Sequence, residues 1–122
     1  MHAEIYRSVK EAEAVLHTHS AFAAAFAVAG KPIPEILPEM TAYLKSGVPV
    51  CEYAPAGSLR LAETVAETLK LSPACLMRNH GLTVYGESPY SAYMRAVCAE
   101  EAAKIFIFSG LTGKVEVTPS AD

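Results

Sequence analysis

The stretch AVLHTHS, residues 14–20, decides how the rest of the chain is interpreted. Its short apolar beginning is typical of a buried β-strand that continues to the histidines. Side chains two positions apart on a strand lie on the same face, roughly 6.5–7 Å from one another, so His17 and His19 project together. Two such imidazoles can reach one metal ion, whereas the same pair on a helix would diverge. The pair alone fits equally an exposed histidine beside a hydrogen-bonded core histidine.

His80 extends this pattern to a second place in the chain. It follows the short apolar run at residues 74–77, which predicts a buried strand, and it precedes Gly81, which lets the backbone turn sharply and approach a site closely. The carboxyl end of a core strand is a usual place for functional groups in α/β folds. Three imidazoles with a fourth position for water or substrate are typical of a catalytic metal site. A turn histidine bonded to the backbone explains His80 as well.

Other polar side chains are weaker candidates. His2 stands at the start of the chain and is expected at the surface, as are Glu35 and Glu39 in a proline-rich stretch. Tyr53 and Tyr85 could donate protons, but a tyrosine next to a strand more often packs with its hydroxyl at the rim. The glycines have neither the spacing nor the context of a phosphate-binding loop.

Composition limits the class of protein. The 122 residues are 52% hydrophobic and 19% charged, which predicts one globular domain. The net charge is −3 and the basic residues are scattered, so we expect no nucleic-acid partner. The apolar runs are too short for a bilayer, and no secretion signal is recognisable, so we expect no membrane association. Three widely spaced cysteines indicate reduced thiols in a cytoplasmic protein.

Helical and strand patterns alternate along the chain, which predicts the α/β class. Helices are expected from about Ile5 to Glu13, at 20–29, at 40–45, from 58 to the break at Pro73, and at 88–109; strands are expected at 14–19, 48–51, 74–77 and 82–85. Residues 1–110 are predicted to form the metal-binding domain, and residues 111–122 a tail.

Several helix ends carry recognisable signals. Ser20, Ser58 and Ser88 are predicted N-caps, the last followed by a proline at the first helical position, and Gly30 is a predicted C-terminal stop. The inner stripe of the last helix is predicted to contain Met94, Val97, Cys98, Ala102, Ile105 and Phe106.

Together with AVLHTHS, the distant stretch RNHGL at residues 78–82 resembles the class II aldolase/adducin family. The segment from residue 33 to residue 58 is similar to the general pattern of that family, and the likeness extends from about Met1 to Gly110. An HTHS element with a distant NHG element is much more specific than an isolated HxH pair. The resemblance implies a three-layer α/β/α sandwich with a mainly antiparallel central sheet.

The same resemblance implies a site and a reaction. His17, His19 and His80 correspond to the family's three ligands of a divalent metal ion, which is usually zinc, with cobalt or manganese as alternatives. The implied activity is that of an aldolase, a lyase that cleaves a ketose phosphate such as fuculose-1-phosphate through a metal-stabilised enediolate. The implied partners are a small-molecule sugar phosphate and further copies of the chain in a homotetramer with active sites at subunit interfaces.

The chain also departs from the family pattern. The catalytic acid/base of the aldolases is a glutamate in a Ser-Ser-Glu element, and the register of that element and of the phosphate-binding loops falls upstream of Met1, so we assign no catalytic residue. Pro38 stands where an interface tyrosine is expected. These departures leave open a catalytically inactive homologue or fragment that acts as a metal-binding or structural oligomer. A sugar-phosphate 4-epimerase is a further alternative.

Overall fold

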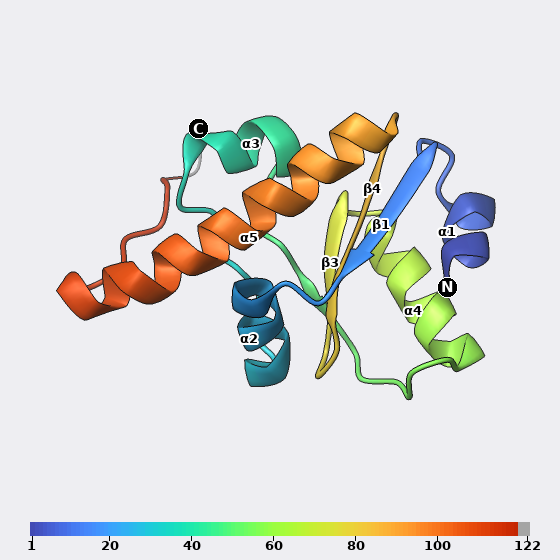
Figure 1. Cartoon of the computed structure of the whole chain (residues 1–122), viewed down its shortest axis with the longest axis horizontal. Helices are drawn as coiled ribbons and strands as arrows, with labels where there is room; N and C mark the ends of the chain where they lie inside the picture. Colours follow the sequence, from blue (N-terminus) through green and yellow to red (C-terminus); the bar gives the residue numbers. More distant parts are fainter. Residues whose placement is uncertain (120–122) are drawn as a thin grey trace.

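A four-stranded sheet with helices on both faces forms the centre of the computed structural model, which describes residues 1–119 (Figure 1). The elements follow in the order α1 (His2–Ser8), β1 (Ala14–Thr18), α2 (Ala21–Ala29), α3 (Pro38–Leu44), β2 (Val50–Cys51), α4 (Leu59–Leu69), β3 (Ala74–Met77), β4 (Gly81–Gly86) and α5 (Pro89–Thr112). Within these residues no helix has the length and apolar character needed to cross a membrane.

The strands lie in the order β1-β4-β3-β2. The pairs β1–β4 and β4–β3 are antiparallel, and only the two-residue strand β2 runs parallel to its neighbour β3. The sheet is therefore mainly antiparallel, as expected. β1 and β2 are its outer strands in the part of the chain that the structure describes.

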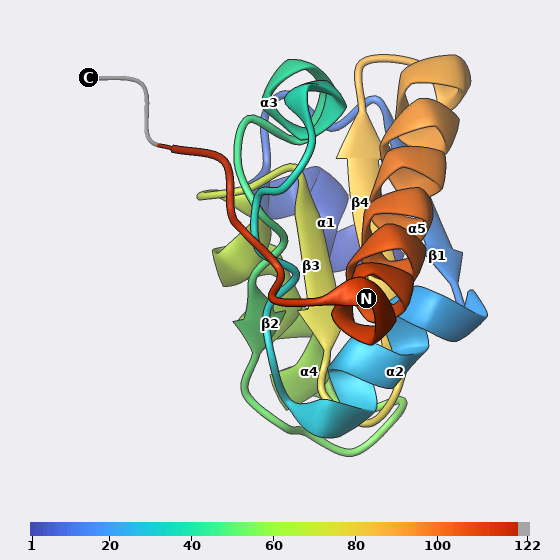
Figure 2. The same cartoon turned by 90° about the vertical axis from the view of Figure 1, so that its left-hand side faces the viewer.

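The two faces of the sheet bury separate hydrophobic clusters, because successive side chains of a strand point to opposite faces. Leu16, Leu76 and Val84 pack on the face covered by α2, α3 and α5, whereas Cys75 and Tyr85 pack on the face covered by α1 and α4. In Figure 2, α2 and α5 lie in front of the sheet and α1 and α4 behind it. The predicted three-layer α/β/α sandwich is thus confirmed.

Three predicted helix ends have the expected geometry. The Ser58 hydroxyl accepts the backbone N–H of Leu61, and Ser88 forms a reciprocal capping box with Ser91 at the start of α5. Gly30 ends α2 with a φ of 65°, in the left-handed region that a residue without a Cβ adopts at little cost.

The prediction for the first helix is wrong at its end. α1 stops at Ser8, well before Glu13, and Val9 is extended with a φ of −113°. Ile5 and Val9 are both buried. Their apolar spacing therefore reflects packing in the core and does not require one continuous helix. The extended segment lets the chain turn back from α1 into β1.

The prediction for Ser20 is also wrong in part. Ser20 precedes α2 as expected, but its side chain accepts no N–H of that helix, and its hydroxyl lies 3.2 Å from that of Thr18. The short helix predicted at 40–45 begins earlier, at Pro38, because proline is well tolerated in the first turn, and it ends at Leu44.

The inner face of α5 differs from the predicted stripe. Of the predicted residues, Cys98 and Ala102 are buried, but Ile105 is 40% exposed. The face against the sheet consists instead of small side chains, including Ala92, Ala99 and Ala103, together with Arg95. Small residues let the long helix lie close to the sheet. The larger apolar side chains of α5 therefore lie on the two sides of the helix and not against the sheet.

The last helix is also longer than predicted. It continues to Thr112, beyond the expected end near Ser109. The backbone N–H of Thr118 then donates to the carbonyl oxygen of Glu35, at 2.8 Å. The end of the predicted tail, residues 120–122, lies outside the described residues.

Candidate metal centre

The three histidines singled out in the sequence lie together in the structure. The ring centroids of His17 and His19 are 4.8 Å apart, and each lies 5.0 Å from that of His80. Each ring offers a nitrogen, and the three potential ligand atoms lie within 4.8 Å of one another. Among residues 1–119 this is the group of histidine, cysteine and carboxylate side chains that could hold a metal ion.

The pairing of β1 with β4 produces this meeting. His17 is opposite Thr83, and Thr18 is opposite Leu82, so the end of β1 lies beside the turn that carries His80. That turn is tight: the N–H of His80 donates to the carbonyl of Met77 at 2.9 Å, and Asn79 has a φ of 58°. Asparagine tolerates this left-handed conformation better than most residues.

Gly81 is required by a close approach of two backbones. A Cβ at this position would lie 2.4 Å from the carbonyl oxygen of Thr18 and 3.0 Å from Cδ2 of the His19 ring. Its backbone is not left-handed, so the sequence prediction of a close approach explains this glycine better than a need for unusual dihedral angles. The absence of a side chain here lets the His19 ring sit against the start of β4.

A backbone hydrogen bond fixes the tautomer of His17. Its Nδ1 lies 2.9 Å from the carbonyl oxygen of Leu82, which can only accept, so Nδ1 carries the proton and donates. The Thr83 hydroxyl is 3.4 Å from the same nitrogen. In the neutral ring the lone pair is therefore on Nε2, which points to Nε2 of His19 at 3.0 Å. A tetrahedral zinc site places two nitrogens about 3.3 Å apart, so this pair suits a shared cation.

The surroundings favour neutral imidazoles. Burial lowers the pKa of His17 below its ordinary value of 6.5, against the opposing effect of the Leu82 hydrogen bond, and the nearby histidines lower it further. Burial likewise lowers the pKa of His80, with a contribution from His19. The neutral form is the one that binds metals. His17 and His80 are half-buried and His19 is exposed, so one side of the cluster is open to solvent.

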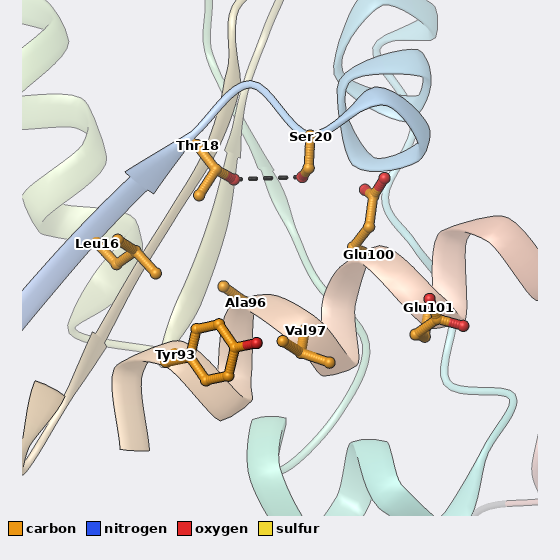
Figure 3. Close-up of a pocket in the computed structure, with 8 residues that line it drawn as sticks. All are labelled: Leu16, Thr18, Ser20, Tyr93, Ala96, Val97, Glu100 and Glu101. Atoms are coloured by element: carbon orange, nitrogen blue, oxygen red, sulfur yellow. Dashed lines mark hydrogen bonds between the residues drawn. The ribbon is translucent and has the colours of Figure 1, made fainter. Parts of the chain in front are cut away.

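A sizeable hollow of the described surface lies away from the cluster. A cavity of about 420 Å³ is lined by Leu16, Thr18, Ser20 and residues of α5 (Figure 3). Since alternate side chains of β1 point to opposite faces, this cavity lies on the other side of the strand from His17. The imidazole cluster is thus a shallow, open site and not the floor of this cavity.

The weaker candidates lie outside the cluster. Tyr85 is buried in β4 opposite Val15, and Tyr53 is 55% exposed. The carboxylate of Glu35 accepts the Thr41 hydroxyl. Within residues 1–119 the potential ligands are the three histidines, and Glu35 is not among them.

Two charged residues of α5, both outside the cluster, were not predicted from the sequence. Glu100 accepts the backbone N–H groups of Phe22 and Ala23 at the start of α2. Arg95 is buried and donates to the carbonyl oxygens of Tyr43 and Tyr85. Their partners are distant along the chain, so no local pattern marks these residues.

The chain is similar to known proteins over most of its length. A family model described as "Class II Aldolase and Adducin N-terminal domain" matches residues 1–107. The L-fuculose phosphate aldolase of Methanococcus maripaludis is 34% identical over 105 residues, which are 86% of this chain and 57% of that protein. The protein of the same name from Methanocaldococcus jannaschii is 32% identical over 93% of this chain and 61% of its own length.

Solved structures show the same likeness. A structure of L-fuculose 1-phosphate aldolase has a TM-score of 0.91 and 28% identity over 98% of this chain and 56% of its own. The L-fuculose-1-phosphate aldolase from Thermus thermophilus has a TM-score of 0.79 and 30% identity, over 98% of this chain and 63% of its own. The chain therefore spans between 56% and 63% of the length of these four relatives.

Proposed function

The chain belongs to the class II aldolase and adducin N-terminal domain family, and from this membership we propose that residues 1–110 form the metal-binding domain of a class II aldolase. In this proposal His17, His19 and His80 bind one divalent metal ion. The reaction is the cleavage of a ketose phosphate such as fuculose-1-phosphate. The relatives named as L-fuculose phosphate aldolases support this choice of substrate.

The observation that carries the proposal is the convergence of three imidazole rings. The Leu82 carbonyl holds the His17 ring so that Nε2 faces Nε2 of His19, and the turn after β3 brings the third ring to 5.0 Å from both. The neutral ligands leave the charge of a cation uncompensated, and the exposed side leaves room for a substrate oxygen. A bound divalent metal ion there would supply Lewis-acid polarisation of a carbonyl group.

Zinc is the proposed metal, because three imidazole ligands with an open fourth position are usual for catalytic zinc. Cobalt and manganese are the alternatives. Metal analysis of the purified protein distinguishes them, and we expect close to one equivalent of metal per chain.

The first experiment compares His80→Ala with His2→Ala. His80→Ala removes one of three ligands and should abolish stoichiometric metal binding, measured by isothermal titration with zinc. His2→Ala removes a histidine that is not one of the three potential ligands, so it should retain stoichiometric metal binding. Equal metal affinity in the two variants would contradict the proposed ligand set.

The activity needs its own test, because a second candidate function is open. Within the described residues no carboxylate joins the histidine cluster, so none of those residues offers a carboxylate as an acid/base group there. This favours a catalytically inactive metal-binding or structural oligomer as the second candidate. An assay for cleavage and 4-epimerisation of fuculose-1-phosphate and related ketose phosphates decides between them: turnover that requires metal supports an enzyme, and a metal-loaded protein without turnover supports the second candidate.

We also propose that several copies of the chain assemble, four in the arrangement expected for the family. The end of α5 supports assembly, because Phe108 is 50% exposed and Leu111 is 80% exposed. Sedimentation velocity gives the number of copies, and a monomer at all concentrations would contradict this part of the proposal.

A further inference from the structure

Glu100 connects α5 to the beginning of α2. Its carboxylate oxygens accept the backbone N–H groups of Phe22 at 3.0 Å and Ala23 at 2.8 Å. In Figure 3 the Glu100 carboxylate points toward the start of the α2 ribbon. A single side chain thus satisfies two N–H groups that the first turn of a helix otherwise leaves without partners.

The residues next to the start of α2 do not cap the helix. Ser20 accepts no N–H from α2 because its hydroxyl faces that of Thr18, and the first turn of α2 contains no acidic residue. A carboxylate at a helix N-terminus is also favoured by the helix dipole. The order at the start of α2 therefore depends on a residue of another helix.

α2 in turn touches both segments that carry the histidines. Its first residue, Ala21, lies two positions after His19, which itself directly follows β1. Near its other end, the carbonyl oxygen of Ala27 accepts the N–H of Asn79 at 3.0 Å, immediately before His80. The helix thus bridges the two parts of the cluster, which are far apart in the sequence.

We propose that Glu100 is a positioning residue of the metal centre: by fixing the start of α2 it holds His19 in register with His80. This inference rests on the proposed metal site. Glu100 acts through the backbone of α2 and does not contact the metal ion. Residues that hydrogen-bond directly to metal ligands typically change metal affinity about 10–100-fold when they are replaced, and for Glu100, which acts one step further away, we expect the lower end of that range.

The chain offers a closely matched pair of variants. Glu100→Gln keeps the length of the side chain but leaves one acceptor oxygen for two N–H groups, and it removes the negative charge at the helix start. Glu101→Gln removes the same charge one position along the same helix, from an exposed side chain. Differences between the two variants therefore report the hydrogen bonds to α2 and not the net charge.

The test is a titration of the metal-free protein with Co²⁺, followed by the visible absorption of the bound ion. We expect Glu100→Gln to weaken Co²⁺ binding about 10-fold and to alter the shape of the d–d bands. Glu101→Gln should match the unchanged protein in both. A purely structural role would lower thermal stability but leave the spectrum of the bound ion unchanged. Identical affinity and spectrum in the two variants would overturn the inference.

Two further measurements separate the possible failures. If the unchanged protein binds no Co²⁺, the proposed metal site is wrong. The NMR signals of the His19 ring in the metal-free protein then test the positioning role alone, and they should shift in Glu100→Gln only. If Glu100→Gln does not fold, Glu100→Asp replaces it in the test. Glu100→Asp keeps both carboxylate oxygens but moves them away from the N–H groups of α2, so it should weaken Co²⁺ binding relative to Glu101→Asp. Equal behaviour of those variants would contradict the inference.

Discussion

His17 is a histidine whose surroundings determine both its tautomer and its charge. Its Nδ1–H donates a hydrogen bond to the Leu82 carbonyl oxygen, and burial lowers the pKa of the ring. Both effects leave a neutral ring with a free lone pair on Nε2. His80 lies in a similar environment, where burial again lowers the pKa.

The lowered pKa values predict how stability depends on pH. In the unfolded chain these histidines take up protons near their ordinary pKa of 6.5, but in the folded protein they resist protonation. The unfolded state therefore binds more protons just below this pH, and the free energy of unfolding should fall as the pH drops below about 6.5. Urea unfolding of the metal-free protein at a series of pH values from about 5 to about 8 checks this. The dependence on pH should become weaker in His17→Asn, and an unchanged dependence would contradict the assignment.

Gly81 is the residue whose replacement should disturb the site most directly without touching a histidine. In Gly81→Ala the new methyl group meets the Thr18 carbonyl oxygen at 2.4 Å and must push the two strands apart. We expect a loss of about 1–3 kcal/mol in the free energy of unfolding, typical of overpacking. Zinc affinity should also fall, because the His19 ring has to move.

The matched control for this change is Gly110→Ala. Gly110 lies in α5, and a Cβ there meets nothing within 4 Å. Alanine is a better helix former, so this variant should be more stable by up to about 1 kcal/mol, with unchanged zinc affinity. Similar effects of the two substitutions would show that the close approach at Gly81 is unimportant.

At the scale of single elements, the helix caps give a direct comparison. Ser88→Ala removes the hydroxyl that accepts the N–H of Ser91 and breaks the capping box of α5, at an expected cost of about 1 kcal/mol in thermal or urea unfolding. Ser20→Ala removes a hydroxyl that caps nothing in α2 and should cost clearly less. A larger loss for Ser20→Ala would contradict the assignment of Glu100 as the cap.

The same two serines show what the sequence predicts and what it does not. Ser88 is followed by proline and its partner Ser91 is local, so the start of α5 was predictable from the residues there. The start of α2 was placed correctly, but its cap comes from Glu100, and nothing near Ser20 encodes that choice. Signals within one element are readable in the sequence, whereas partners supplied by another element are not.

The candidate metal centre likewise combines features that were predictable within one element with contacts between elements that were not. The strand before His17 and the turn around His80 were predictable because each is marked by local apolar and glycine patterns. Their meeting depends on the pairing of β1 with β4, which was not predicted. The resemblance to a family implied that the three histidines share a metal ion, but not how the strands pair. The roles of Thr83 and of the Leu82 carbonyl could not be predicted, because they follow from that pairing.

At the scale of the whole molecule, metal binding and folding should be coupled. The ligands come from β1, the residue just after it and the turn between β3 and β4, and these segments are brought together only in the folded chain. Zinc that binds the folded state alone stabilises it by about 2.7 kcal/mol when its free concentration is about 100 times the dissociation constant. The midpoint temperature of thermal unfolding should rise when zinc is added and return to its metal-free value when a chelator removes the zinc. His80→Ala should show no shift, and a shift of equal size in that variant would contradict the coupling.

The outer edge of β1 has a consequence for the behaviour of the protein in concentrated solution. An exposed strand edge invites a neighbouring polypeptide to hydrogen-bond to it, and chains commonly discourage this with charges or proline. Residues 14–18 contain neither a proline nor an acidic or lysine side chain, but the hydroxyl of Tyr6 accepts the N–H of Val15 at 3.0 Å. Tyr6 thus occupies a backbone donor with which a foreign strand could otherwise pair, so we expect the first helix to make this edge less open to intermolecular strand pairing.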